Sequence, residues 1–263
     1  MTRWRWLGVL VILIGGLVVV PAMILIVTFS SNGPLVDGQV LPNGGIVVVD
    51  GYVSVALVPT GEGSYVLVDT GNDPAGAAID RALQRLGASR GDVAAILITH
   101  GHPDHLGACG GFPDAKIFAL KAEMPLLEGR VAAGGPLPRL LGPASLCPTE
   151  RIVPVLDGST MQLGTLRLQA LAMPGHTAGS TAWWIDGVLF FGDAADARSD
   201  GTVSPAKWIF SDDQPQATAS LERLAAYVAE SGLRVDAMAF SHSGVIVGSA
   251  PLLSLAGAST PAP

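Results

Sequence analysis

Residues 99–105 read Thr-His-Gly-His-Pro-Asp-His, a stretch that places three imidazoles and one carboxylate within six positions. Alternate residues of an extended segment share a face, so His100 and His102 can hold one metal ion together. If the chain then turns into a helix, Asp104 and His105 point elsewhere and can hold a second ion. Imidazole and carboxylate ligands together suit zinc, iron or manganese. The stretch therefore predicts a metal centre with room for two ions.

The other two histidines of the chain, His176 and His242, also follow runs of strand character. The first three histidines come after Val93–Ile98, a continuous apolar run of strand length that predicts a strand buried on both faces. Every histidine thus lies where a strand passes into a loop, which is where active sites are commonly built. Taken singly, these residues have structural alternatives. A lone exposed histidine is usually a surface residue, His176 and His242 can be structural, and Asp104 can be a helix N-cap.

The elements around these histidines predict a mixed α/β fold of stacked layers. Aspartate-led N-caps and closing glycines predict one helix from Asp73-Pro74 to Gly87 and another from Asp213 to Gly232. The Gly- and Pro-rich segment 123–148 predicts a loop with one short helix. Short β-branched runs between turns predict strands at 46–50, 53–58, 64–69, 93–98, at three or four places within 159–191, and at 237–240. This order predicts two halves packed sheet against sheet, a sandwich.

Composition excludes several classes of protein. The chain has 263 residues, a formal net charge of −7 and only 15 Lys and Arg, so no basic surface indicates nucleic acid as a partner. Two cysteines are too few for a cysteine-rich scaffold or a four-thiolate zinc site. Cys109 and Cys147 are either a disulfide pair or two small buried side chains.

The N-terminal segment predicts a membrane partner. Leu7–Phe29 is 23 residues without a charged side chain, and a helix of that length spans about 34 Å, enough for a hydrocarbon core of about 30 Å. Arg3 and Arg5 precede it, and the next basic residue is Arg81. The positive-inside rule then places the N-terminus in the cytoplasm and the rest in the periplasm or outside the cell. A cleaved signal peptide is the alternative.

These observations divide the chain into an anchor at residues 1–30, a linker at 31–45 and a catalytic domain at 46–263. The linker is rich in Gly, Pro, Asn and Ser, which is typical of a connecting segment.

The ordered motifs resemble those of the metallo-β-lactamase-fold hydrolase superfamily over about residues 45–248. The resemblance rests on the His100–His105 motif, on Pro174-Gly175-His176-Thr177, on Gly192-Asp193 and on Ser241-His242, with Val68-Asp69-Thr70-Gly71 as the preceding turn. It implies a four-layer αβ/βα sandwich that binds two metal ions, by default zinc. One ion would be held by His100, His102 and His176, the other by Asp104, His105 and His242, with Asp193 as the bridge.

The mechanism that the resemblance implies is hydrolysis of an ester, lactone or thioester by a metal-bound hydroxide, because bound cations lower the pKa of water towards about 7. Asp104 would orient the water and carry its proton, while Asp69 would support the site from outside. The alternative for Asp193 is a purely structural role as a residue of the turn Phe191-Gly192-Asp193. A non-catalytic metal-binding domain and a mononuclear iron dioxygenase acting on persulfides remain the competing functions.

Differences between this sequence and the motifs of individual branches indicate which branch of the superfamily it resembles. An acidic residue at position 193 disfavours a β-lactamase. The glyoxalase II-like ligand set is complete, but only 21 residues follow His242, too few for that branch's C-terminal helical region. Lactonases often place a tyrosine near the metals, and none of the three tyrosines here lies in an obvious loop beside the site. Trp208 and Phe210 are either an apolar wall for a small-molecule substrate or ordinary packing.

Overall fold

The computed structural model describes residues 19–140 and 147–257, which form two units, one ending at Asn32 and one beginning at Gly33. In the first unit, residues 19–29 are helical. Among the described residues, no helix combines the length and the apolar character needed to cross a membrane. The predicted anchor at Leu7–Phe29 begins within residues 1–18, which lie outside the described part. The predicted anchor, linker and domain boundaries stay predictions.

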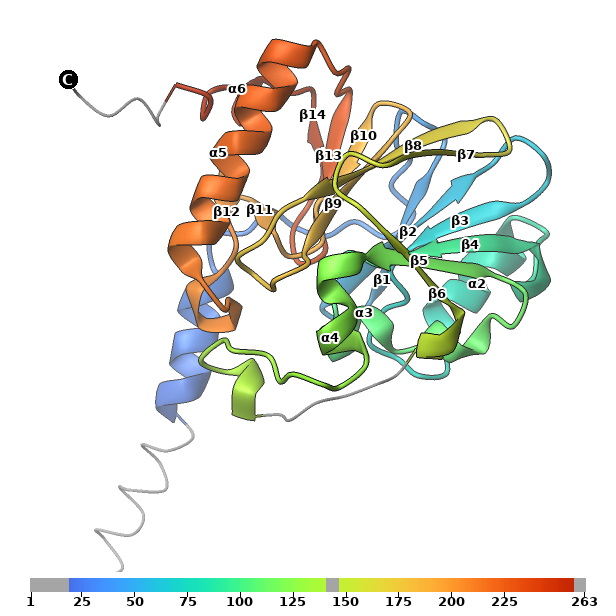
Figure 1. Cartoon of the computed structure of the whole chain (residues 1–263), viewed down its shortest axis with the longest axis horizontal. Coiled ribbons are helices and arrows are strands. Elements are labelled where there is room, and N and C mark those ends of the chain that lie inside the picture. Colours follow the sequence, from blue (N-terminus) through green and yellow to red (C-terminus); the bar gives the residue numbers. More distant parts are fainter. Residues whose placement is uncertain (1–18, 141–146, 258–263) are drawn as a thin grey trace, which may run out of the picture. The chain divides into compact units, whose positions relative to one another are not determined.

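The second unit is built on two six-stranded sheets (Figure 1). The order in the first sheet is β1 (Ile46–Asp50), β2 (Val53–Pro59), β3 (Tyr65–Val68), β4 (Val93–Leu97), β5 (Lys116–Leu120) and β6 (Ile152–Val155). The order in the second is β14 (Ile246–Val247), β13 (Ala237–Ala239), β10 (Val188–Phe190), β9 (Thr181–Ile185), β8 (Leu166–Ala172) and β7 (Thr160–Leu163). A separate pair consists of β11 (Ala195–Ala197) and β12 (Val203–Pro205).

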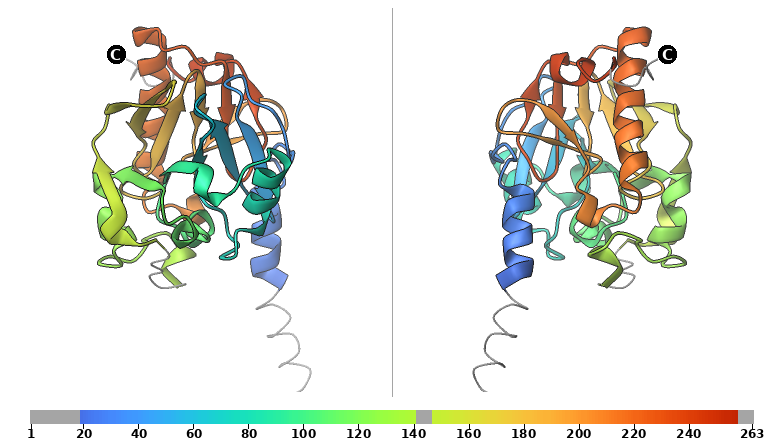
Figure 2. Two further views of the ribbon diagram at one scale, coloured as in Figure 1. Left: turned by 90° about the vertical axis from the view of Figure 1, so that its right-hand side faces the viewer. Right: turned by 90° about the vertical axis from the view of Figure 1, so that its left-hand side faces the viewer.

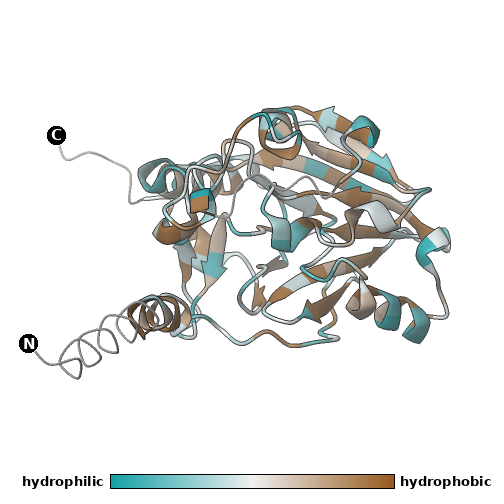
Figure 3. Cartoon of the chain, turned by 90° about the horizontal axis from the view of Figure 1, so that it is seen from below, coloured by the Kyte–Doolittle hydropathy of each residue, from teal (hydrophilic) through white to brown (hydrophobic). Residues whose placement is uncertain are grey.

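Three hydrophobic clusters hold four layers together, so the predicted αβ/βα sandwich is confirmed. One cluster lies between the sheets and contains Leu97 of β4 and Phe190 of β10. The other two join the outer sheet faces to helices α2 (Ala77–Arg85) and α5 (Gln214–Ser231). These helices lie on opposite sides of the paired sheets (Figure 2). Hydrophobic and hydrophilic residues alternate along several strands (Figure 3), as strands with two different faces require.

Strands β5, β6 and β14 and the β11–β12 pair were not predicted from the sequence. Strand β6 contains Pro154, which cannot donate a ladder hydrogen bond and reads as a break in a sequence pattern. The structure accommodates it because β6 is the last strand of its sheet, where one side of the strand has no partner. The short helix predicted within 123–148 is confirmed as α4 (Met124–Leu127).

The start predicted for the first helix is wrong, whereas that of the second is confirmed. Helix α2 begins at Ala77 rather than at Pro74, because the Asp73 carboxylate accepts hydrogen bonds from Ala75 N and Ala77 N and forms a turn. Gly76 follows at φ 66°, a left-handed conformation that delays the helix. In α5, by contrast, Asp213 accepts a bond from Gln216 N at 2.9 Å and caps the helix as predicted.

A disulfide joins Cys109 to Cys147 and settles the two alternatives for this pair. Cys109 lies four residues after His105 and is packed in the cluster beneath α2. The bond therefore ties the segment that carries the first histidine motif to the start of the chain leading into β6.

Replacing both cysteines by alanine is expected to lower the free energy of unfolding by about 3–4 kcal/mol, from the loop-closure entropy of a cross-link between residues 38 positions apart. Urea unfolding followed by tryptophan fluorescence measures the difference. Wild-type protein treated with a reductant is the matched control and should unfold like the double variant. Equal stability of oxidised and reduced wild-type protein would contradict the cross-link.

Candidate metal centre

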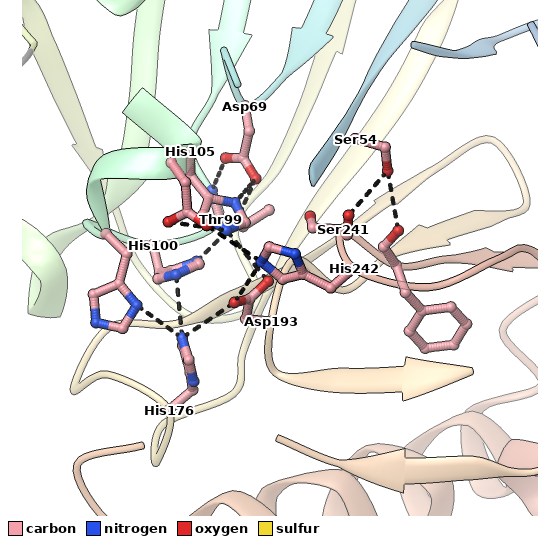
Figure 4. A network of polar contacts seen from close by, with 12 residues as sticks. Ser54, Asp69, Thr99, His100, His105, His176, Asp193, Ser241 and His242 are labelled. Carbon is pink, nitrogen blue, oxygen red and sulfur yellow. Dashed lines mark hydrogen bonds and ion pairs between the residues drawn. The ribbon is translucent and has the colours of Figure 1, made fainter. Parts of the chain in front are cut away.

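The four segments that carry the histidines and Asp193 all follow strands and converge at one end of the sandwich. The segment after β4 leads into the short helix α3 (Pro103–Leu106), and the other three are the β8–β9 loop, the turn after β10 and the turn after β13. All seven predicted ligands meet there, in three overlapping groups whose ligand atoms lie within 4.8 Å of one another. Figure 4 shows five of them pointing toward one another. The groups are His100, His102 and His176; His100, His105 and Asp193; and Asp104, His105 and His242.

The first group is a buried cluster of three imidazoles. His176 Nε2 lies 3.2 Å from His100 Nε2 and 3.0 Å from His102 Nδ1. All three side chains are buried, although imidazole is a polar group. Three ring nitrogens therefore face one small volume from two different loops.

Asp193 lies between this cluster and the remaining histidines. Its Oδ1 is 3.2 Å from His105 Nε2, and its Oδ2 is 3.2 Å from His242 Nε2 and 3.6 Å from His176 Nε2. Asp104 completes the second cluster, with Oδ2 at 3.4 Å from His242 Nε2 and Oδ1 at 3.9 Å from His105 Nε2. The Asp193 carboxylate thus contacts imidazoles of both clusters.

Outer acceptors fix which nitrogen of two rings faces inward. His105 Nδ1 lies 2.8 Å from Asp69 Oδ2 and donates to it, and His242 Nδ1 donates to the Tyr52 carbonyl oxygen at 2.9 Å. With Nδ1 carrying the hydrogen, the neutral ring presents the lone pair of Nε2 to the centre. The predicted supporting role of Asp69 is consistent with this contact.

Two rings of the three-histidine cluster, those of His100 and His176, are oriented in the same way. The Thr99 hydroxyl donates to Asp69 Oδ2 at 2.7 Å, so it accepts from His100 Nδ1 at 3.1 Å. The Ser211 hydroxyl donates to the Lys207 carbonyl and accepts from His176 Nδ1 at 3.3 Å. In both rings Nε2 is left as the inward-facing acceptor.

The donor set fits a cation. The Nε2 lone pairs of His100 and His176, 3.2 Å apart, repel one another unless a positive charge lies between them. Within the described residues, His102 Nε2 is buried without a hydrogen-bond partner, and the buried atoms His105 Nε2 and Asp193 Oδ1 lie 3.2 Å apart as an ion pair. Buried polar atoms rarely stay unpaired. Imidazole nitrogens and carboxylate oxygens are the ligands that zinc prefers after thiolate.

The electrostatics divide the histidines into two kinds. Burial, together with the neighbouring His102, lowers the pKa of His176 to about 3. Burial also lowers the pKa of His105, but Asp193 and Asp104 outweigh it and raise that pKa to about 10. Burial raises the pKa of Asp193, but His242 and His105 reverse this and hold it well below its usual range. The three-histidine cluster is thus neutral near pH 7, and the Asp193 side is ionic.

Metal-free protein is expected to lose stability as the pH falls from about 6.5 towards 3. The pKa of His176 is about 3 in the folded state and about 6.5 when unfolded, so the unfolded chain takes up the proton first. Urea unfolding of zinc-depleted protein at several pH values measures this loss. The His176→Gln variant, which cannot be protonated, should show a shallower decline, and an identical decline in both proteins contradicts the prediction.

Backbone geometry explains the glycines and one aspartate beside the ligands. Gly192 has φ 56°, and a Cβ there would lie 2.3 Å from Thr99 Oγ1. Gly175 has φ 133°, and a Cβ would lie 2.1 Å from Ala217 N. Asp69 also has a positive φ, of 58°, which is unusual outside glycine and is compensated by its bonds to Thr99 and His105.

Two residues at the site were missed from the sequence. The ring of Tyr52, in the turn between β1 and β2, stacks on His242 with centroids 5.8 Å apart, so the expectation of no tyrosine beside the site is wrong. Nothing in the sequence links that turn to His242, 190 residues away. Glu123 is buried and bonds to both histidine loops. Trp208 of the predicted apolar wall is 57% exposed, and Phe210 is half-buried.

Comparison with known proteins agrees with this geometry. Residues 48–242 match the family described as the metallo-beta-lactamase superfamily. A hydroxyacylglutathione hydrolase of Cupriavidus taiwanensis is 36% identical over 162 residues, which cover 59% of this chain and 53% of that protein. A metallo-beta-lactamase family protein from Thermus thermophilus has a similar structure, with a TM-score of 0.59, 27% identity and coverage of 82% of this chain and 78% of that one.

A third match shows the fold alone. A B3 metallo-beta-lactamase with an active-site glutamic acid superimposes with a TM-score of 0.62 at 23% identity, covering 89% of this chain and 90% of that one. The chain spans 53%, 59% and 53% of the length of three hydroxyacylglutathione hydrolases that it matches.

Proposed function

The chain belongs to the metallo-beta-lactamase superfamily, and on this premise we propose that it is a zinc-dependent hydrolase of an ester, lactone or thioester bond. The observation that carries the proposal is the position of Asp193, whose carboxylate lies between two groups of inward-facing imidazoles. A carboxylate in that position can bind two cations, one through each oxygen. The proposed cofactor is therefore a pair of zinc ions.

The ligand assignment follows the two clusters. His100, His102 and His176 would hold one ion, Asp104, His105 and His242 the other, and Asp193 both. Bound zinc supplies a Lewis acid that lowers the pKa of water and polarises the bond to be cleaved. Neutral imidazoles bind a metal ion without first losing a proton. The three-histidine cluster can therefore bind zinc near pH 7, because burial lowers the pKa of His100 and His176.

Asp104 is the residue to which we assign proton transfer. Its side chain is 20% exposed, compared with 14% for Asp193 and 10% for His242. Of these three side chains, Asp104 is therefore the most accessible to water. One oxygen faces His242 at 3.4 Å, and the other is 3.9 Å from His105. A carboxylate engaged through one oxygen keeps the other available to accept a proton and to orient the attacking water.

A thioester is the favoured bond within this class. The support is the name of the relatives, hydroxyacylglutathione hydrolase, together with the acidic residue at position 193. Lys207 does not offer a free charge to an anionic substrate, because its Nζ lies 3.5 Å from the buried Asp196 carboxylate. Trp208 remains exposed and available to contact an apolar substrate group.

The test combines metal analysis with a substrate panel. Protein purified without added metal is expected to contain two zinc ions per chain by mass spectrometry. It should hydrolyse one of a hydroxyacylglutathione thioester, a p-nitrophenyl ester or an acyl lactone faster than a β-lactam. Two bound zinc ions without turnover on any of them would indicate a non-catalytic metal-binding domain. One iron with thiol-dependent oxygen uptake would indicate the dioxygenase instead.

We also infer an extracytoplasmic location for the domain. The disulfide supports it, because disulfides persist in oxidising compartments. The two arginines before the apolar N-terminal segment favour the same orientation. Protease added to intact cells whose outer membrane, if present, has been permeabilised should digest the domain; digestion only after lysis of the cytoplasmic membrane contradicts this location.

A further inference from the structure

Glu123 is a buried carboxylate that the proposed chemistry does not use. It ends a short 3₁₀ turn (Lys121–Glu123) after β5 and is 1% exposed. Among the described residues no Lys, Arg or His forms an ion pair with it. Burying a carboxyl group without a cation is costly, and its pKa is accordingly raised to about 7 by burial. A residue placed at such a cost calls for a reason beyond packing.

The partners of Glu123 come from the two loops that form the three-histidine cluster. Oε1 accepts from Gly101 N at 2.6 Å, and Gly101 is the residue between His100 and His102. Oε2 accepts from the Thr177 hydroxyl at 2.9 Å and from Gly179 N at 2.7 Å. Each oxygen thus holds one of the two loops, and all three partners are donors, as an ionised carboxylate requires.

The two loops belong to different sheets. The His100 segment follows β4 of the first sheet, whereas the His176 loop joins β8 and β9 of the second. A single rigid carboxylate that bonds to both fixes the distance between them. The fit is close, because a Cβ at Gly179 would lie 2.2 Å from Glu123 N, and a Cβ at Gly101 would lie 3.2 Å from Glu123 Oε1.

We propose that Glu123 is a positioning residue for the metal centre, whose carboxylate sets the spacing between His176 and the His100–His102 pair. The inference rests on the proposed function, since it concerns how tightly that centre holds its metal. Residues that orient ligands from outside the coordination sphere typically change metal affinity by about 10- to 100-fold when they are replaced. Glu123 acts through the backbone of both loops.

The isosteric variant Glu123→Gln tests this. Its amide keeps the shape but presents N–H groups to backbone and hydroxyl donors, so one loop loses its acceptor. Zinc affinity, measured by competition with a chromophoric chelator, should fall about 10- to 100-fold. The absorption bands of the cobalt-substituted protein should shift, because the angle between the histidine ligands changes. Glu123→Asp, which keeps the charge but shortens the reach, should recover part of the affinity.

The matched control is Leu83→Ala, which opens a cavity at a buried residue of α2 and destabilises the fold. It should lower the melting temperature and leave zinc affinity and the cobalt spectrum unchanged. If Glu123→Gln does not fold, Thr177→Val removes only one of the three bonds and should weaken zinc binding several-fold.

The outcomes separate the two proposals. Wild-type zinc affinity and cobalt spectrum in both Glu123→Gln and Thr177→Val, or an equal loss of affinity in Leu83→Ala, would overturn the role of Glu123 while leaving the hydrolase intact. Failure of the wild-type protein to bind zinc or cobalt would overturn the proposed function itself, and this positioning role with it.

Discussion

The Asp193→Asn variant is expected to lose about three orders of magnitude in kcat/KM for its substrate. The carboxylate faces His105, His242 and His176 at 3.2–3.6 Å, so it is the negative charge shared by both proposed metal positions. The amide keeps the shape but removes that charge and turns N–H groups toward the centre. A loss of several kcal/mol of transition-state stabilisation corresponds to about a thousandfold in rate.

Steady-state kinetics on the thioester and metal analysis of the same preparation measure this effect. Asp200→Asn, an exposed carboxylate in the turn between β11 and β12, is the matched control and should keep wild-type activity. NMR titration of the metal-free variant gives a second readout. Asp193 is the strongest of the neighbours that raise the pKa of His105, so that pKa should fall below about 10 in Asp193→Asn. Activity within tenfold of wild type, with two zinc ions retained, would contradict the bridging role.

Removal of the metal is expected to abolish hydrolysis and to lower the melting temperature by about 10–20 °C. A ligand present at a hundred times its Kd stabilises the folded state by about 2.7 kcal/mol per site. For a domain of this size each kcal/mol corresponds to about 2–4 °C. The physical reason lies in His100 Nε2 and His176 Nε2, whose lone pairs face one another at 3.2 Å. Without a cation, repulsion between them opposes folding.

Dialysis against a chelator, followed by calorimetry and activity assays, tests this second prediction. Adding back zinc should restore both quantities in proportion, with a break at two equivalents. A break at one equivalent would mean that only one cluster is occupied and that Asp193 does not bridge. Activity that survives complete removal of metal would rule out metal-assisted hydrolysis by this chain.

The central sandwich could be predicted because its signals are local. Alternating or continuous apolar runs mark β1 to β4, β9 and β10, and the Asp213 cap with Gly232 marks α5. Strands β5 and β6 escaped because β6 contains a proline and both depend on pairing with a neighbour. The start of α2 was misplaced because Asp73 can cap a helix or close a turn, and the Gly76 conformation favours the turn.

The residues of the site also differ in whether local sequence signals could predict them. The predicted ligands and their order along the chain were visible in the sequence, because a metal centre needs several His and Asp side chains close together, and four of them occur within residues 100–105. Asp69 was recognised as a support. Glu123 and Tyr52 were not, since a lone Glu or Tyr carries no signal until its neighbours in space are known.

The residues of the candidate site could be chosen from the amino-acid sequence: five histidines at strand ends, and carboxylates at positions 104 and 193. Spacing within one segment is sufficient for the first four, because residues 100–105 are held together by the chain itself. How the His176 loop of one sheet meets the His100 segment of the other, and which groups hold them there, became visible only in the folded chain. That distance is set by packing between two sheets and by the Glu123 carboxylate, and no local pattern encodes an interaction between residues so far apart in sequence.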